Sequence, residues 1–456
     1  MIELTATELF RRYREGSLSP VEVTAAVLDR IDELEPRLHA LYAYDPEHAR
    51  AAAKQSEQRF RAGEPGALDG IPLTLKENIA TKGTPVPLGT AATELTPAAA
   101  DAPAAARVRE AGAVLLAKTT MPDYGMLTSG LSSFHTASRN PWDTARTPGG
   151  SSAGAAVAAA AGYAPLHVGT DIGGSIRLPA GWCGLVGFKP SFGRVPVDPP
   201  YLGRVAGPLT RTVADAALLM SVLAQPDPRD HMSLPPAEVP WTDLGGELTG
   251  LRIGLQLDPG AGLPVEAEIA AAVAEAARAF ESAGASVEPL APFLTREMLD
   301  GLDTFWRVRA WSDISALPAE RQAKVLPYIA DWARGGADVP GLAAYRGFAQ
   351  IDAMSAAAVR ATEPYDFVLS PTCPVGPPPA DWASPTGDPE RPFEHIAFTV
   401  PYNMSGQPAV SVNCGYTDAG MPIGLQIAGR RFDDAGVLRA AAAFEGIRGP
   451  GRSPEV

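Results

Sequence analysis

The chain has 456 residues, of which 46% are hydrophobic and 20% charged, a composition typical of a globular protein with a sizeable core. Its formal charge is 38 minus 52, or −14, and it has no run of five basic residues. We therefore expect neither a nucleic acid nor an anionic membrane surface as a partner.

The cysteine pattern and the N-terminal sequence argue against further classes of protein, namely disulfide-rich, zinc-binding, secreted and membrane-spanning ones. Three cysteines, an odd number without C-x-x-C spacing, and scattered histidines predict neither a disulfide framework nor a zinc site, so we expect no metal and no cofactor. Residues 1–16 lack the order of a signal peptide, and no long apolar segment follows. A cytoplasmic enzyme is the expectation.

The N-terminal region, residues 1–62, is predicted to be helical. Residues 19–22, SPVE, form a capping box with proline at the first helical position. Apolar residues then recur at helical spacing, namely Val23, Val27, Ile31 and Leu34.

From residue 70 onward, short apolar segments alternate with helical ones, such as 264–283 and 433–446. Several of the apolar segments do not alternate with polar residues, as expected for strands covered on both faces. We predict an α/β fold, a single-domain α/β/α sandwich with a large twisted mixed sheet flanked by helices. The predicted strands are GIPLTL, AGAVLLAKT, APLHVGT, LRIGLQL, ASVEPL, YDFVLSPT, PAVSVNCGY and PIGLQIAG.

The domain organisation depends on a proline-rich segment, 226–240. It is interpreted as a linker or a long surface loop. A boundary between two domains there is the alternative, but strands of the same kind occur on both sides. Residues 290–360 contain Trp306, Trp311 and Trp332 and form either a cover over a pocket or helices packed on the sheet. The single domain 1–456 then divides into N-terminal helices (1–62), a catalytic core (63–225), a variable linker and helical cover (226–360) and a C-terminal sheet and helix (361–456).

Lys76 ends the apolar segment GIPLTL. An ammonium group in a buried strand is costly unless it is paired or neutral. Lys76 is therefore either an unusual buried base or a lysine whose ammonium reaches solvent from the end of a strand.

The second candidate is TPGGSSAGAAVAAAAG, residues 147–162, where two serines stand in a glycine turn before an alanine-rich helix. Ser152 satisfies G-x-S-x-G, but ARTPGG before it does not resemble the strand that a nucleophile elbow requires. The turn is also a weak match to a phosphate loop. Two alternatives remain here, an α/β-hydrolase with Ser152 as nucleophile and His395 as base, and a non-catalytic anion- or nucleotide-binding protein.

The third candidate is HVGTDIGGSIRLPAGWCGLVGFKP, where a strand enters a glycine turn and Ser175 follows. The glycine pair lets a substrate carbonyl approach the backbone N–H groups closely. Thr170, Asp171 and Arg177 flank the turn and are predicted to hold it by hydrogen bonds. No histidine stands in a catalytic motif and the chain has no S-x-x-K, so a lysine base reached from further away remains.

Together these three segments resemble those of the amidase signature family. The separations agree, with 75 residues from Lys76 to Ser151 and 24 from Ser151 to Ser175. The resemblance extends over nearly the whole chain except 226–360, through CGLVGFKPSFGRV, GPLTRTVADAALLM and PYNMSGQPAVSV.

The resemblance implies a Ser–cis-Ser–Lys triad with Ser175 as nucleophile, Ser151 as the bridging serine and Lys76 as the terminal base. It implies a cis peptide bond between Gly150 and Ser151, with Ser152 as a neighbouring loop or cap hydroxyl. It also implies an oxyanion hole built from the backbone N–H groups of Ile172, Gly173, Gly174 and Ser175.

The same resemblance predicts the substrate class. The expected activity is hydrolysis of small amides through an acyl-enzyme, extending to aryl esters, anilides or carbamates. The alternative within the family is the glutaminase subunit of a tRNA-dependent amidotransferase. A homodimer is compatible with the family. The acyl pocket is predicted to be apolar because of the residues at its expected position, Met126, Leu127, Thr128 and Ser129.

Overall fold

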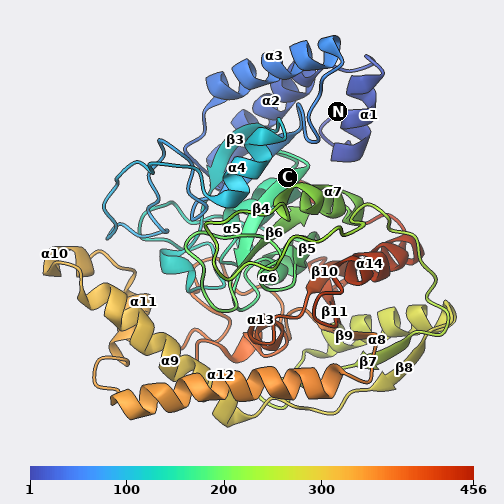
Figure 1. Cartoon of the computed structure of the whole chain (residues 1–456). Helices are drawn as coiled ribbons and strands as arrows, with labels where there is room; N and C mark the ends of the chain where they lie inside the picture. Colours follow the sequence, from blue (N-terminus) through green and yellow to red (C-terminus); the bar gives the residue numbers. More distant parts are fainter.

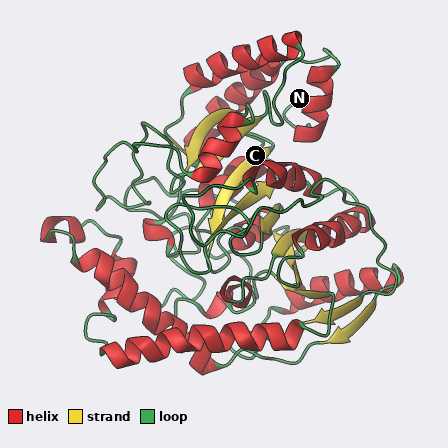
Figure 2. Ribbon diagram, in the orientation of Figure 1, coloured by secondary structure: helices red, strands yellow, loops and turns green.

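One 11-stranded sheet crosses the molecule and includes strands from both halves of the chain. The computed structural model describes residues 1–456, and Figures 1 and 2 show the sheet enclosed by helices. The strands are β1 (Leu41–Tyr42), β2 (Pro72–Lys76), β3 (Val114–Thr119), β4 (Leu166–Asp171), β5 (Val186–Lys189), β6 (Val205–Thr210), β7 (Arg252–Leu255), β8 (Ser286–Pro289), β9 (Phe367–Pro371), β10 (Ala409–Tyr416) and β11 (Pro422–Gly429).

The helices lie between these strands. They are α1 (Ala6–Arg14), α2 (Pro20–Leu38), α3 (Pro46–Ala62), α4 (Pro103–Glu110), α5 (Ala153–Ala160), α6 (Arg177–Cys183), α7 (Val213–Leu223), α8 (Ala267–Ser282), α9 (Arg296–Ser315), α10 (Ala319–Gln322), α11 (Pro327–Arg334), α12 (Gly341–Thr362), α13 (Val400–Met404) and α14 (Asp434–Arg448). Two short 3₁₀ helices, Asp123–Gly125 and Glu394–Ile396, complete the set.

The sheet is mixed, with the strand order β1-β3-β2-β4-β6-β5-β10-β11-β9-β7-β8. Strand β2 is parallel to both β3 and β4, and β7 is parallel to both β8 and β9, whereas the central pairs are antiparallel. Residues an odd number of positions apart in a strand face opposite sides of the sheet, as Gly424 and Gly429 of β11 do. The side that Gly424 faces contacts Gly181 of α6, and the side that Gly429 faces contacts Val437 of α14. Helices therefore cover both faces, and the predicted sandwich is confirmed.

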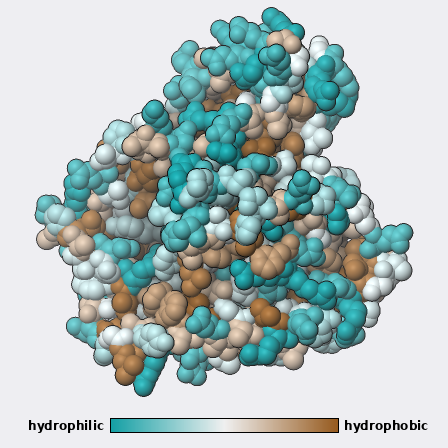
Figure 3. Space-filling view, in the orientation of Figure 1, coloured by the Kyte–Doolittle hydropathy of each residue, from teal (hydrophilic) through white to brown (hydrophobic).

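The N-terminal region is helical as predicted. Ser19 begins α2 with the expected capping box, in which its side chain accepts from the Val21 N–H and the Glu22 carboxylate accepts from the Ser19 N–H. Helices α1 to α3 lie together at the top of Figure 1, and the surface there is mostly hydrophilic in Figure 3. No helix of the molecule is both long and apolar enough to cross a membrane.

Three strands, β1, β5 and β6, are not predicted by the sequence pattern. Strand β1 has two residues and β5 has four, too short for a pattern to appear. The sequence of β6, VAGPLT, contains glycine and proline, which disfavour strands in isolation. In the folded chain, all three pair with neighbouring strands of the sheet.

The proline-rich segment 226–240 contains no helix or strand. Strands before and after it belong to the same sheet, so it does not separate two sheets. Residues 290–360 form α9 to α12, and α9 packs along α12 (Figure 1).

Candidate active site

The site lies where two parallel strands end. In the pairing of β2 with β4, Leu75 is opposite Val168, so the carboxyl ends of both strands reach the same edge of the sheet. Lys76 ends β2, and Thr170 and Asp171 end β4. Open α/β sheets commonly bind ligands at this edge.

Lys76 is completely buried. Its Nζ lies 2.8 Å from Ser151 Oγ and 3.0 Å from Thr170 Oγ1. Burial lowers the pKa of Lys76 to about 7, because Asp171 offsets the desolvation only in part and Arg204 adds a repulsive charge. A substantial fraction of this lysine is therefore neutral near pH 7 and able to accept a proton.

Ser151 and Ser152 have different surroundings although they are adjacent. The Gly150–Ser151 peptide bond is cis, and Ser151 lines the cavity. Ser152 is completely buried, and its Oγ donates to the Thr170 carbonyl at 3.2 Å while its N–H donates to the Ser175 carbonyl at 3.1 Å. Ser152 therefore joins two segments of the site and does not face the cavity.

The α/β-hydrolase alternative required Ser152 to meet His395. His395 lies in the cavity wall, but its Nε2 is 2.7 Å from Thr128 Oγ1. Burial lowers the pKa of His395 to about 3. Since Ser152 is bonded to Thr170 and His395 to Thr128, this alternative is wrong.

Asp171 holds the turn that carries Ser175. Its carboxylate accepts from the N–H groups of Gly174 (2.8 Å) and Ile176 (3.0 Å) and from the Arg177 guanidinium. Burial alone would raise the pKa of Asp171, but the charge and hydrogen bonds of Arg177 outweigh it and lower the pKa. Arg177 is also completely buried, and Asn403 and Gln426 accept from its other N–H groups.

The amide groups of the turn divide into two sets. The N–H groups of Ile172, Gly173 and Ser175 have no partner in the protein, whereas that of Gly174 donates to Asp171. Ser175 itself is partly exposed to the cavity. Three unpaired donors next to an accessible serine can hold a developing oxyanion.

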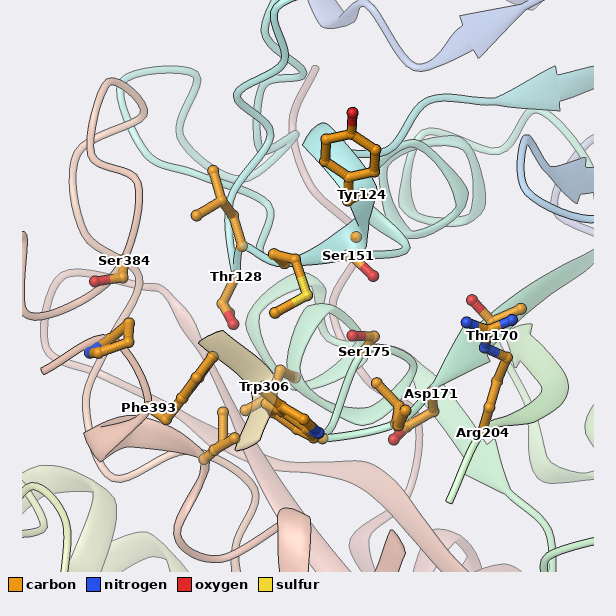
Figure 4. Close-up of a pocket in the computed structure, with 18 of the residues that line it drawn as sticks. Tyr124, Thr128, Ser151, Thr170, Asp171, Ser175, Arg204, Trp306, Ser384 and Phe393 are labelled. Atoms are coloured by element: carbon orange, nitrogen blue, oxygen red, sulfur yellow. The ribbon is translucent and has the colours of Figure 1, made fainter. Parts of the chain in front are cut away.

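These side chains meet in an open cavity of about 800 Å³. Figure 4 shows Ser151 and Ser175 in its middle, with Trp306 and Phe393 to one side and Arg204 to the other. The remaining lining residues are Asn78, Tyr124, Gly125, Met126, Leu127, Thr128, Thr170, Asp171, Ile172, Gly173, Leu178, Arg309, Tyr328, Ser384, Pro392, His395 and Ile396.

Three of the four predicted pocket residues, Met126, Leu127 and Thr128, line this cavity. Ser129 does not: it is completely buried and its Oγ donates to the Trp382 carbonyl at 2.8 Å. Ser129 therefore lies outside the cavity lining, unlike the three residues that precede it.

Most residues of the opposite cavity wall are not predicted by the sequence. Trp306 and Arg309 come from α9, Tyr328 from α11, and Phe393 and Ile396 from the segment near residue 395. The tryptophans of 290–360 were the only sequence signal for this wall, and of the three only Trp306 lines the cavity.

Comparisons with known proteins identify the family of the chain. The model of the Amidase family matches residues 22–438. The chain belongs to the amidase signature family. It is therefore a hydrolase that acts on carbon–nitrogen bonds.

The chain is 36% identical to a glutamyl-tRNA(Gln) amidotransferase subunit of Myxococcus xanthus, over 98% of this chain and 97% of the relative. It is 33% identical to an acylamidase of Rhodococcus erythropolis, over 98% and 95%.

Solved structures of this family are similar over nearly their whole length. A bacterial aryl acylamidase of the amidase signature family has a TM-score of 0.89 and 31% identity, over 97% of this chain and 96% of that one. The corresponding glutamyl-tRNA(Gln) amidotransferase subunit of Thermotoga maritima has a TM-score of 0.79 and 26% identity, over 100% and 98%.

Proposed function

We propose that this chain is an amidase that cleaves amides of apolar acyl groups, and also anilides, aryl esters or carbamates, through a Ser175–Ser151–Lys76 triad. The observation that carries the proposal is the hydrogen bond between Lys76 and Ser151. Lys76 is completely buried and pairs with no carboxylate, and Ser151 lines the same cavity as Ser175. A buried neutral lysine is a suitable base for activating a serine hydroxyl.

In this proposal neutral Lys76 accepts the Ser151 proton while Ser151 accepts the proton of Ser175. Ser175 Oγ then forms a bond to the substrate carbonyl carbon, and the charge on the carbonyl oxygen is held by the N–H groups of Ile172, Gly173 and Ser175. The carbon–nitrogen bond breaks as Ser151 returns a proton to the leaving amine. Water then adds to the acyl-enzyme by the same proton path and releases the acid.

The test is hydrolysis of hexanoyl-p-nitroanilide by purified wild-type and variant chains. Ser175→Ala and Ser151→Ala should each lower kcat by at least about 10³-fold, because they act as one unit with Lys76. Ser282→Ala, an exposed serine on α8 that bonds only the Arg278 carbonyl, is the matched control. A fluorophosphonate should label Ser175, and peptide mapping that found the label on Ser152 would overturn the assignment.

A second candidate is the glutaminase subunit of a tRNA-dependent amidotransferase. It is favoured by the names of the sequence relatives, because further proteins of 34–35% identity are also glutamyl-tRNA(Gln) amidotransferase subunits of the same type. The names therefore support this candidate more than the first one, whereas the composition of the pocket supports the first.

Glutamine carries an α-ammonium that requires a partner when it is removed from water. Asp171 is the only acidic residue that lines the cavity. Asp171 is 1% exposed, and its oxygens already accept from Arg177, Asn403 and backbone N–H groups. The cavity lining therefore offers no free carboxylate to the α-ammonium of glutamine.

The two candidates are separated by a matched pair of amides, glutamine and glutaramic acid, which is glutamine without the α-ammonium. The first candidate predicts that glutaramic acid is hydrolysed with the higher kcat/KM. Preference for glutamine, together with partner subunits that co-purify with the chain, would establish the second candidate instead.

A further inference from the structure

Two arginines in the cavity wall have no acidic partner. Arg204 precedes β6, and Arg309 lies on α9 one turn after Trp306. Neither forms an ion pair, and the only hydrogen bond of the Arg204 guanidinium is a weak one, to the Pro199 carbonyl at 3.4 Å. Arginine is rarely fully buried without a partner, and these two partly buried guanidinium groups keep donors free for a ligand.

The ring of one tyrosine contacts both arginines. The Arg309 Cζ lies 4.5 Å from the centroid of the Tyr201 ring, and the Arg204 Cζ lies 5.4 Å from it. Cation–π contacts of this kind orient a guanidinium but do not neutralise it. Burial and the neighbouring Arg309 both lower the pKa of Arg204, which is the effect expected of a cation without a counter-ion.

The surroundings provide no counter-ion for this pair. Asp171 is the only acid in the cavity wall and is already bonded to Arg177. Asp198 lines a neighbouring cavity that Arg204 also reaches, but no ion pair joins Asp198 to Arg204. In a chain of net charge −14, this end of the cavity is therefore locally positive.

The cationic end and the apolar end lie on opposite sides of the serine. In Figure 4, Arg204 lies to one side of Ser175, and Phe393 and Trp306 lie to the other. A substrate bound across Ser175 would place its two ends in two different environments. An arginine pair selects a carboxylate, which accepts two parallel hydrogen bonds from one guanidinium.

We propose that Arg204 and Arg309 form a subsite for a substrate carboxylate, so that the preferred substrates are N-acyl amino acids with an apolar acyl group. The inference rests on the proposed amidase function, which puts the acyl group against the apolar wall of Trp306 and Phe393. The leaving amine then extends toward Arg204 and carries the carboxylate.

The experiment compares matched amides that differ in one group. N-hexanoyl-β-alanine carries the carboxylate on the amine side, and in N-hexanoyl-isopentylamine an isopropyl group replaces it. The glycine and 4-aminobutyrate analogues vary the reach to the arginines. The mono-hexylamide of glutaric acid carries the carboxylate on the acyl side. The quantity measured is the ratio of kcat/KM for each carboxylate substrate to that for the neutral amide.

We expect wild type to prefer an N-hexanoyl amino acid. Arg204→Gln and Arg309→Gln should each lower the ratio about 10- to 100-fold, the effect of losing a charged hydrogen bond. The control Arg278→Gln removes an exposed arginine of α8 and should not change the ratio. If Arg204→Gln does not fold, Arg309→Gln still decides the result.

Other outcomes separate this proposal from the amidase proposal. Preference for the neutral amide, or a ratio that neither variant changes, would overturn the subsite and leave the amidase activity intact. Preference for the glutaric mono-hexylamide would overturn the amine-side assignment. If no amide is hydrolysed, the proposed function fails; the subsite is then judged by whether N-hexanoyl-β-alanine raises the Tm of wild type and not of Arg309→Gln.

Discussion

The Nζ atom of Lys76 lies 2.8 Å from the Oγ atom of Ser151, and no carboxylate pairs with that nitrogen. An ammonium buried without a counter-ion is strongly disfavoured, so the protein stabilises the neutral amine at this position. The burial of Lys76 therefore costs folding free energy, and the same burial makes its amine able to accept a proton from Ser151.

Activity should depend on the protonation of this lysine. Burial lowers the pKa of Lys76 to about 7, and only the neutral form can accept a proton. We expect kcat/KM on a neutral anilide to rise about tenfold per pH unit below about pH 7 and to level off above it. A profile that is flat between about pH 6 and pH 8, measured with a substrate that does not titrate in that range, would contradict this role.

The same residue should lower stability in a pH-dependent way. In the unfolded chain the pKa of Lys76 returns to about 10.4, so the unfolded state binds more protons than the folded state between about pH 7 and 10.4. Stability contributed by this group therefore rises with pH over that window. Lys76→Met should be more stable than wild type at about pH 7, and by a smaller margin at about pH 9.

Chemical denaturation of both proteins at the two pH values measures that margin. The difference between wild type and variant is needed because burial also lowers the pKa of Lys118 and of Lys189 to about 7. An equal margin at both pH values would show that Lys76 is not neutralised by folding.

Asp171→Asn should unfold the turn that carries Ser175. The substitution leaves the completely buried Arg177 without its counter-charge, which costs about 3–5 kcal/mol of unfolding free energy. Asp143→Asn breaks an exposed pair with Arg146 and should cost under about 1 kcal/mol. Urea denaturation of the two variants gives the comparison, and similar losses would exclude a structural role for the buried pair.

The sequence predicted the sandwich and eight of its strands, because these depend on local patterns, whereas the three segments proposed as catalytic came from the resemblance to a known family. It could not predict that Ser129 turns toward Trp382 or that Ser152 bonds Thr170, since single side-chain directions depend on contacts between distant segments. Arg204 and Arg309 had no local signal either. These two residues are 105 positions apart in the sequence, and both contact Tyr201 only in the folded chain.

Gly174→Ala should damage the turn by steric contact. Gly174 has φ +126°, and an added Cβ would lie 2.7 Å from Leu178 Cδ1 and from Thr399 Oγ1. We expect kcat to fall about 10²-fold as the neighbouring N–H groups move. Gly250→Ala is the control, because Gly250 also has a positive φ (+82°) but no atom within 4 Å of an added Cβ. Loss of activity in both variants would point to general destabilisation.

Trp306→Ala should change the choice of acyl group. Trp306 is 5% exposed, lines the cavity and packs edge-on against Phe393, with ring centroids 5.1 Å apart. Its removal leaves space at the apolar end, so the ratio of kcat/KM for decanoyl-p-nitroanilide over that for butyryl-p-nitroanilide should rise, although the cavity costs about 3–5 kcal/mol of stability. The control Trp382→Ala removes an exposed indole outside the cavity lining and should leave the ratio unchanged. A ratio that falls in Trp306→Ala would mean that the acyl chain does not lie against this wall.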